Sequence, residues 1–270
     1  MDKRTKTTVS LFNTALIALL LFLYPLYLYG GCVSGDCENG QGVYLFPDGA
    51  KYTGQFKDSA LHGSGTLIYA NGTSYTGEFR DNRFNGTGTL TTPDGIYEGT
   101  FTDNVCEGEG SFTGTDGRTY TGQFRNNEME GRGTMLLPNG DRYMGDFRKG
   151  RFDGQGTLST ADGRTYTGQF RDGKIDGRGT MTSPGYRYEG SFKDGRYDGF
   201  GTFTYPNGDV YKGEFRDGER CGKGTYTSAT GGTYTGDFRD GTYNGQGILT
   251  MPDGRRYTGP FTDGKFMGEK

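Results

Sequence analysis

The feature that most restricts the fold is a repeat of 23 residues that runs through the sequence after Gly30. Each repeat starts at a tyrosine, and the spacing is shortened to 22 residues after Tyr75 and Tyr166. The starting residues are Tyr52, Tyr75, Tyr97, Tyr120, Tyr143, Tyr166, Tyr188, Tyr211, Tyr234 and Tyr257. A short fixed period indicates one small structural unit that is stacked many times and completes its core on its neighbours.

The repeat that starts at Tyr166 shows what one unit forms. In the segment YTGQF the large side chains alternate with polar ones, which is the pattern of a half-buried strand, so Tyr166 and Phe170 are predicted on one face. Asp172 and Gly173 are predicted to form a tight turn to a second strand, and Pro-Asx-Gly sequences such as residues 206–208 connect one unit to the next. We expect both Asx-Gly pairs to supply the positive φ angles of hairpin turns. Each unit is therefore predicted to be a β-hairpin.

Glycine is the most unusual part of the composition, with 52 residues of 270, and aromatic residues make up 14%. An aromatic content this high argues against disorder. Glycine weakens a strand unless an aromatic ring covers its bare backbone. We therefore expect rows of Tyr and Phe to pack over rows of Gly, with Gly168, Gly177 and Gly179 all on the face of Tyr166.

The unit Tyr-x-Gly-x-aromatic-x-Asp/Asn-Gly-x-x-x-Gly-x-Gly is similar to the MORN repeat (membrane occupation and recognition nexus) over about residues 39–268. The resemblance implies an all-β fold, an elongated antiparallel meander of about ten hairpins that serves as a scaffold or a membrane-associated binding module. We expect a membrane-anchored member of bacterial origin. The chain has no Trp, which the family often places at the second aromatic position. The first four units replace the turn glycine, which should alter the turn type more than the fold; the replacements are Ser59, Asn82, Asn104 and Asn127.

The N-terminal region is the one long apolar segment. Residues 9–29 contain no charged side chain, and 21 residues at about 1.5 Å each span roughly 30 Å, the thickness of a bilayer core. Basic residues precede it, so the positive-inside rule predicts residues 1–8 in the cytoplasm and the repeats on the extracytoplasmic side, periplasmic or extracellular. We predict a single-pass transmembrane helix or signal anchor at 9–29, a Cys-containing linker at 30–38 and the repeat domain at 39–270. A cleaved signal peptide and a lipoprotein modified at Cys32 stay open as alternatives.

Four cysteines follow this segment. An exported chain permits disulfides, and Cys32 and Cys37 are close enough in sequence to close a small loop. Cys106 and Cys221 lie far apart in the repeat order, so we predict that they are unpaired residues in loops. There is no Cys-x-x-Cys sequence or Cys/His cluster, so no zinc site is expected.

The sequence gives little support for catalysis or for a cofactor. Gly-x-Gly occurs in each unit, but phosphate-binding loops precede a helix, and no helix is predicted after residue 30. His62 is the only histidine, so a triad has no ordinary base. We expect no enzyme activity, no cofactor and no metal site. A carbohydrate-active hydrolase that uses a carboxylate pair is the third functional hypothesis.

A row of basic residues is the most regular surface feature. The residue after the Phe of the first strand is Lys or Arg in eight of the ten units and is predicted to point away from the rings. These residues, the basic ladder, are Lys57, Arg80, Arg125, Arg148, Arg171, Lys193, Arg216 and Arg239. The next residue is acidic in eight of ten units, so the ladder is either a solvated face with cross-strand pairs or a track for an elongated partner.

These observations lead to a non-catalytic, membrane-anchored scaffold whose extended β surface binds proteins or cell-envelope macromolecules. The alternative is a module that binds anionic lipid head groups at the membrane surface. The net charge of −3 argues against a nucleic-acid partner. The last unit is predicted to leave an open strand edge at residues 257–261, which favours a homodimer through the C-terminal repeats.

Overall fold

The computed structural model describes residues 30–268, and these residues form 22 strands and no helix. They divide into two compact units between Arg151 and Phe152, which are described separately. The first unit contains β1 (Gly31–Gly35), β2 (Gln41–Leu45), β3 (Lys51–Lys57), β4 (Ala60–Ile68), β5 (Ser74–Arg80), β6 (Arg83–Thr92), β7 (Gly95–Thr102), β8 (Val105–Gly114), β9 (Thr119–Arg125), β10 (Glu128–Leu136) and β11 (Arg142–Arg148). The second contains β12 (Arg151–Ser159), β13 (Thr165–Arg171), β14 (Lys174–Ser183), β15 (Tyr186–Lys193), β16 (Arg196–Thr204), β17 (Val210–Arg216), β18 (Glu219–Thr227), β19 (Thr233–Arg239), β20 (Thr242–Thr250), β21 (Arg256–Thr262) and β22 (Lys265–Phe266).

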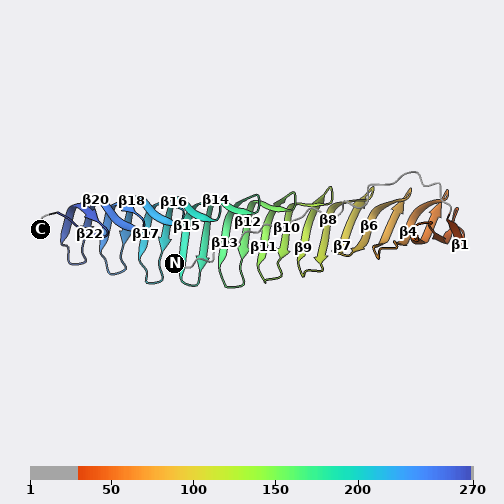
Figure 1. The fold of residues 1–270 in the computed structure, drawn as a ribbon, viewed down its shortest axis with the longest axis horizontal. Helices are drawn as coiled ribbons and strands as arrows, with labels where there is room; N and C mark the ends of the chain where they lie inside the picture. The colour runs from red at the N-terminus through yellow and green to blue at the C-terminus, as the bar shows by residue number, and fades with distance from the viewer. Residues whose placement is uncertain (1–29, 269–270) are drawn as a thin grey trace. The chain divides into compact units, whose positions relative to one another are not determined.

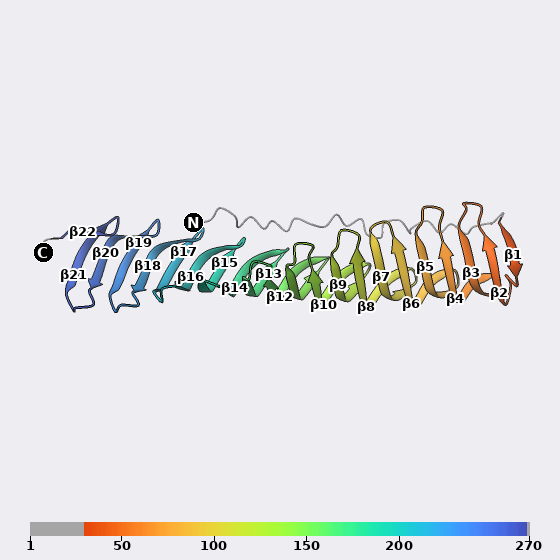
Figure 2. The same cartoon turned by 90° about the horizontal axis from the view of Figure 1, so that it is seen from below.

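Each unit is an antiparallel meander. Within each unit, every strand pairs with the strand that follows it in the sequence, as β4 does with β5 and β5 with β6, or β13 with β14 and β14 with β15. Figures 1 and 2 show the strands of each unit side by side in chain order, without crossovers. Short turns are sufficient to connect such neighbours. The predicted meander of repeated hairpins is therefore confirmed.

Two kinds of turn connect the strands, one at each edge of the sheet. Within a repeat, a two-residue turn places both Asp172 and Gly173 at positive φ, 47° and 82°, which is the type I′ geometry of a twisted hairpin. Between repeats, a three-residue turn covers residues 206–208, where Gly208 donates to the carbonyl of Tyr205 at 3.0 Å. In this turn only the glycine has positive φ. Both kinds of Asx-Gly turn therefore contain a glycine with positive φ, as predicted, and in the first kind the aspartate has positive φ as well.

The first unit uses asparagine or serine in place of the second turn residue without a change of turn type. The φ angles are 62° at Ser59, 65° at Asn82, 71° at Asn104 and 67° at Asn127, in the same left-handed region as the turn glycines. Asn104 Oδ1 also accepts a hydrogen bond from the N–H of Phe84 at 2.8 Å, and the N–H of Asn104 donates to the carbonyl of Phe84 at 3.0 Å. The prediction of an altered turn type is therefore wrong, because asparagine keeps the turn and adds a bond to the preceding repeat.

The tyrosine that starts a repeat lies across two glycines. A Cβ built on Gly179 would be 2.5 Å from Cε2 of Tyr166, and one on Gly168 would be 2.6 Å from its hydroxyl oxygen. Tyr166 is 1% exposed, and its hydroxyl donates to the carbonyl of Gln169 at 3.0 Å. Eight other starting tyrosines donate the same hydrogen bond to the carbonyl of the residue three positions later in the sequence: Tyr52, Tyr75, Tyr97, Tyr120, Tyr143, Tyr188, Tyr211 and Tyr234. Built Cβ atoms meet the tyrosine in the same way at Tyr52, Tyr75, Tyr97, Tyr120, Tyr188, Tyr211 and Tyr234, which confirms the expected packing of rings on glycine.

The first glycine of Gly-x-Gly has another role. A β-bulge shifts the register of β14 opposite Gln169, and Gly177 lies in this bulge with φ of 105°. A Cβ on Gly177 would collide with the side chain of Gln169, whose Oε1 accepts the N–H of Arg178 at 2.8 Å. The prediction that Gly177 lines the aromatic face together with Gly179 is wrong, because the bulge turns it to the opposite side.

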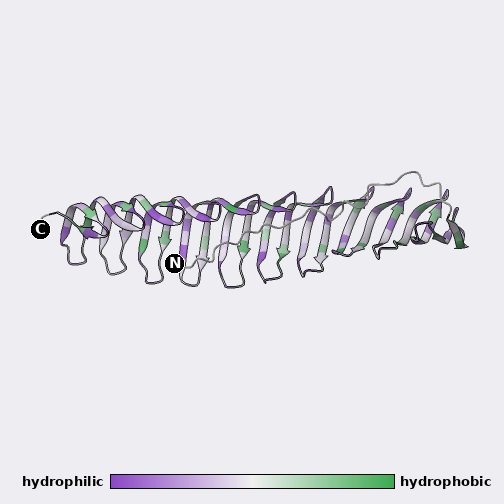
Figure 3. Cartoon of the chain, viewed as in Figure 1, coloured by the Kyte–Doolittle hydropathy of each residue, from purple (hydrophilic) through white to green (hydrophobic). Residues whose placement is uncertain are grey.

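The core of each unit is a row of edge-to-face aromatic pairs on one face of the sheet, which we call the aromatic face. The ring of Tyr166 lies 5.2 Å from that of Phe170 in its own repeat and 5.0 Å from that of Phe192 in the next, with the planes 84° and 80° apart. Each such pair contributes about 0.5–1.5 kcal/mol beyond the burial of area. Along the strands, hydrophobic and hydrophilic residues alternate (Figure 3). Each repeat is therefore stabilised by its neighbour.

Two cysteines lie in strands rather than in loops. Cys106 is fully buried in β8, opposite Phe101, and Cys221 is half-buried in β18. Both are free thiols, and burial raises the pKa of Cys106 to about 12. The prediction of loop positions is wrong, because Cys106 fills the place that Phe84 fills in the preceding repeat.

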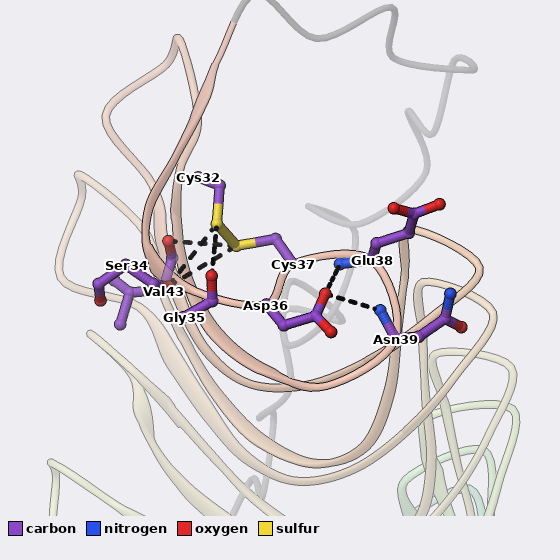
Figure 4. Close-up of a disulfide and its surroundings, with 8 residues drawn as sticks. All are labelled: Cys32, Ser34, Gly35, Asp36, Cys37, Glu38, Asn39 and Val43. Carbon is purple, nitrogen blue, oxygen red and sulfur yellow. Dashed lines mark hydrogen bonds between the residues drawn. A yellow bond between two sulfur atoms is a disulfide. The ribbon is translucent and has the colours of Figure 1, made fainter.

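The other two cysteines form a disulfide at the start of the described residues (Figure 4). Cys32 of β1 is bonded to Cys37 in the loop before β2. In the same loop the carboxylate of Asp36 accepts hydrogen bonds from the N–H groups of Glu38 and Asn39 at 2.9 and 3.0 Å. These backbone bonds lower the pKa of Asp36. The linker is therefore held by both covalent and hydrogen bonds.

Two further predictions concern the ends of the chain. The segments 1–8 and 9–29 lie outside the described residues, and within residues 30–268 there is no helix with the length and apolar character to cross a membrane. At the other end, β22 covers part of the edge that was predicted to be open, since Phe266 pairs with Phe261. The predicted edge is therefore wrong at Phe261, and self-association through these repeats stays a prediction.

Candidate binding surface

All members of the basic ladder lie on the surface of the protein. All eight residues are exposed, and each stands at the end of the first strand of its repeat, beside the two-residue turn. They alternate with the buried Phe residues and so lie on the face opposite the aromatic face.

Acidic side chains balance much of the positive charge along this edge. Arg80 Nη2 lies 3.8 Å from Asp103 Oδ1 in the next repeat. A basic residue at the start of a second strand is also paired. Lys174 Nζ lies 2.7 Å from Asp194 Oδ1, and its hydrogen bond lowers the pKa of that carboxyl. Exposed pairs of this kind contribute little to stability, about 0–1 kcal/mol each. Within the ladder itself, Arg80 and Arg171 are paired with acidic side chains, Arg171 with Asp176 at 3.3 Å.

The aromatic face of residues 152–268 carries a further set of rings outside the Tyr and Phe rows. We call them the outer rings: Tyr186, Tyr197, Phe203, Tyr205, Tyr226 and Tyr243. All six are half-buried. Tyr197 stacks on Tyr188 at 4.0 Å and Tyr243 on Tyr234 at 3.8 Å, so these two rings form an outer layer over the buried starting tyrosines.

The remaining outer rings join these two stacked pairs. Phe203 lies 5.9 Å from Tyr197 and 4.6 Å from Tyr205, measured between ring centroids. Tyr226 lies 6.1 Å from Tyr205 and 6.3 Å from Tyr243. The outer rings therefore form a continuous aromatic surface across strands β15 to β20.

Arg220 of β18 lies among these rings. It pairs with Phe215 across the hairpin, the register position that Ile175 occupies opposite Phe170. Its guanidinium carbon is 5.5 Å from the ring centroid of Tyr211 and 5.6 Å from that of Tyr226. Distances in this range allow cation–π attraction.

The hydrogen bonds of Arg220 involve only the backbone. Its Nη2 donates to the carbonyl of Gly241, and among residues 30–268 it makes no ion pair with a carboxylate. Arg220 is thus a half-buried cation with aromatic neighbours and no acidic partner in the described part of the chain.

Asp209 is a buried carboxylate at the margin of the same surface, 9% exposed. It accepts hydrogen bonds from the hydroxyl of Tyr226, from Asn207 Nδ2 at 2.8 Å and from the N–H of Ala229 at 2.8 Å. The Tyr226 hydroxyl is the largest cause of a lowered pKa at Asp209, followed by the Ala229 N–H. Asp209 is therefore ionised near neutral pH and fixed in orientation.

His62, the acidic side chains and the Gly-x-Gly segments are the other candidates for chemistry within residues 30–268. His62 Nδ1 lies 3.7 Å from the exposed carboxylate of Asp81. No group of three or more His, Cys, Asp or Glu side chains in this range is arranged to hold a metal ion. Gly177 and Gly179 of one Gly-x-Gly lie within a strand and its bulge, and not in a loop before a helix.

Sequence reasoning missed the outer rings and Arg220, because it treated the repeat only through the positions that all units share. The available signal was the position that varies. Once the repeats are superposed on their starting tyrosines, Arg220 falls where other units have Leu61, Phe84 or Ile175. A charged residue in an apolar row is the departure that indicates a local function.

Repeated hairpins that build one continuous core by stacking on their neighbours define a β-repeat protein. The model of the MORN repeat matches ten segments of the chain, and from the second match onward each begins at a starting tyrosine. The matches are residues 31–51, 52–74, 75–96, 97–117, 120–142, 143–163, 166–186, 188–210, 211–233 and 234–255. The chain belongs to the MORN repeat family. The partial unit before Tyr52 is matched as a repeat, and the last match ends before Tyr257.

Solved structures with some likeness include the SAS-4 (dCPAP) TCP domain of Drosophila melanogaster in complex with a proline-rich motif of Ana2 (dSTIL). It is 18% identical with a TM-score of 0.37, and the match covers 63% of this chain and 87% of that one. A mutant TCP10 domain of Danio rerio CPAP is 13% identical with a TM-score of 0.30, covering 82% and 99%. Scores this low carry no argument about this chain. No curated protein matches it.

Proposed function

We propose that this chain is a non-catalytic scaffold that binds an extended segment of a partner protein across the outer rings of residues 152–268. The observation that carries the proposal is the continuous surface of six half-buried aromatic side chains around Arg220. Tyr and Arg are the residues most enriched among the energetic centres of protein interfaces. The MORN repeat fold supplies a rigid support for them, since two of the rings stack on buried tyrosines.

The spacing of the repeats suits an extended ligand. Two strands at about 4.8 Å each give roughly 9.6 Å per repeat. Three residues of a polyproline II helix rise about 9.3 Å. Every third residue of such a segment would therefore meet an equivalent position on the next repeat, and aromatic-lined grooves are a common way to recognise this conformation.

The same proposal places the repeats outside a membrane, displayed by an anchor at residues 9–29. The Cys32–Cys37 disulfide supports this placement, because disulfides persist in oxidising compartments. Protease treatment of intact cells tests it. Degradation of the repeats without lysis supports an exported domain, and full protection of them contradicts it.

The lipid head-group alternative receives no support from the charge distribution. Within the basic ladder, Arg80 and Arg171 have acidic partners, and the net charge of the chain is −3. Anionic membranes attract clusters of unpaired Lys and Arg. A protein partner is therefore the better-supported ligand.

Site-specific photo-crosslinking tests the proposed surface. A photoreactive phenylalanine analogue at position 203 stands on the aromatic face, and one at position 202 stands on the opposite face of the same strand. The full chain is mixed with acetylated and amidated proline-rich peptides. Crosslinks at position 203 but not at position 202 are expected, and equal crosslinking at both positions would show that the outer rings are not the binding surface.

A further inference from the structure

Arg220 is the one basic residue in a row of apolar positions. The other members of this row are Leu61, Phe84, Cys106, Met129, Phe152, Ile175, Tyr197, Tyr243 and Phe266. The hairpin therefore does not require an arginine here, since an aliphatic or aromatic side chain pairs with the same Phe in other repeats. A partly desolvated charge without an ion-pair partner is costly. A residue that adds such a cost without being required by the fold is a candidate for recognition.

We propose that Arg220 binds a carboxylate of the partner segment, from an Asp or Glu side chain or from a chain terminus. The inference rests on the proposed function, because a segment lying on the outer rings would bring the carboxylate to the guanidinium. Arg220 uses one N–H group on the carbonyl of Gly241. Arginine has five N–H donors in a planar fork, so a two-bond contact with a carboxylate is still open to it.

Two hydroxyl groups border the same position. Tyr205 and Tyr243 both have pKa values raised by burial, and the charge of Arg220 opposes that rise at both, so both phenols lie within its electrostatic reach. Neither hydroxyl has a hydrogen-bond acceptor among the residues that the structure describes. They are therefore available as neutral donors beside the guanidinium.

Asp209 supplies a fixed negative charge that acts on the same two phenols, Tyr205 and Tyr243. Its carboxylate is ionised and bonded to Tyr226, whose ring lies 5.6 Å from the guanidinium carbon of Arg220. A doubly charged phosphate would be repelled by this fixed negative charge more strongly than a singly charged carboxylate. The surface is therefore better suited to an acidic residue than to a phosphorylated one.

The anion site is tested first without a peptide. The full chain, labelled with 15N in its arginine side chains and kept in an uncharged detergent that covers residues 9–29, is titrated with sodium acetate and, separately, with sodium chloride. A saturable shift of the Arg220 Nε–H signal with acetate alone is expected, whereas the exposed Arg256, which lies outside the basic ladder, should show no saturable shift. Equal responses of Arg220 to the two salts would overturn the inference, whatever the peptides below do.

The partner chemistry is tested with three blocked peptides of Ala and Pro, nine residues long, that carry Glu, Gln or phosphoserine at the centre. The Glu peptide is expected to bind about tenfold more tightly than the Gln peptide, and Arg220→Leu should abolish this difference. Arg220→Leu restores the apolar residue of the row and is expected to fold. Arg256→Leu, which removes an exposed arginine outside the basic ladder, is the control that should keep the difference.

The outcomes separate the two proposals. Equal binding of the Glu and Gln peptides overturns the carboxylate site and leaves the scaffold function standing. Tighter binding of the phosphoserine peptide overturns the preference for a single charge. A shift with acetate but no binding of any peptide overturns the proposed extended-segment function and supports the anion site alone.

Discussion

The two units of this chain use the same hairpin but differ at the positions around it. In residues 31–151 the variable position beside the Phe row is filled by Leu61, Phe84, Cys106 and Met129, and asparagine occupies three of the two-residue turns. In residues 152–268 the corresponding positions include Tyr197, Arg220 and Tyr243, and the turns use glycine. Both units form the same hairpins, so the positions that they share determine the fold. The variable positions add hydrogen bonds between repeats in the first unit, and in the second unit they supply outer rings and Arg220.

The largest expected effect is alkaline unfolding, and it should affect the second unit first. Burial raises the pKa of Tyr52 in the first unit and of Tyr166 in the second to about 12, against about 10 for an exposed phenol. A raised folded-state pKa means that the stabilisation is complete below about pH 10 and is lost as pH rises towards 12, because the unfolded chain ionises first. Repeats in both units therefore lose stability as the pH rises from about 10 towards 12.

The second unit has more tyrosines whose pKa is raised by burial. Its additional tyrosines with raised pKa values are Tyr197, Tyr205, Tyr226 and Tyr243, whereas the first unit adds Tyr69. Phe79→Trp and Phe192→Trp place one fluorescent reporter in each unit of a chain that has no Trp. The reporter at position 192 should change at the lower pH. Simultaneous transitions of the two reporters would remove this difference between the units.

The next effect tests what the units share. Gly88→Ala in the first unit and Gly179→Ala in the second each place a Cβ 2.5 Å from Cε2 of the tyrosine that covers it. Overpacking of this kind costs about 1–3 kcal/mol, and we expect similar losses in the two units by urea unfolding. Gly31→Ala is the control, since nothing lies within 4 Å of the added methyl. A near-neutral result at either site would show that ring-on-glycine packing is not common to both units.

The sequence was sufficient to predict the hairpin, the tyrosine at which each repeat starts and the packing of Tyr166 on Gly179. Each of these depends on a spacing of residues that is local and repeated. It failed at Gly177, since a β-bulge changes the register without any change in the alternation of residue types. It also failed at Arg220 and the outer rings. Their neighbours, such as Tyr226 and Tyr243, come from different repeats, and only the stacking of strands brings them together.

The smallest change in stability is expected when the turn residues of the two units are exchanged. Asn104→Gly removes the bond from the N–H of Phe84 to the asparagine side chain and is expected to cost about 0.5–1.5 kcal/mol. The reverse change, Gly195→Asn, should stabilise the second unit by a similar amount, because the N–H of Gly195 already bonds to Ile175 at 2.8 Å and nothing lies within 4 Å of an added Cβ.

Alanine at the same turn position distinguishes the contribution of the side-chain hydrogen bond from the cost of the positive φ angle. The φ of 81° at Gly195 strains alanine, which has no acceptor to offer, so Gly195→Ala should destabilise the chain while Gly195→Asn stabilises it. Urea unfolding with the reporter at position 192 measures both. If Gly195→Asn and Gly195→Ala lower stability equally, the asparagine bond adds nothing between repeats, and the turns of the two units differ in sequence alone.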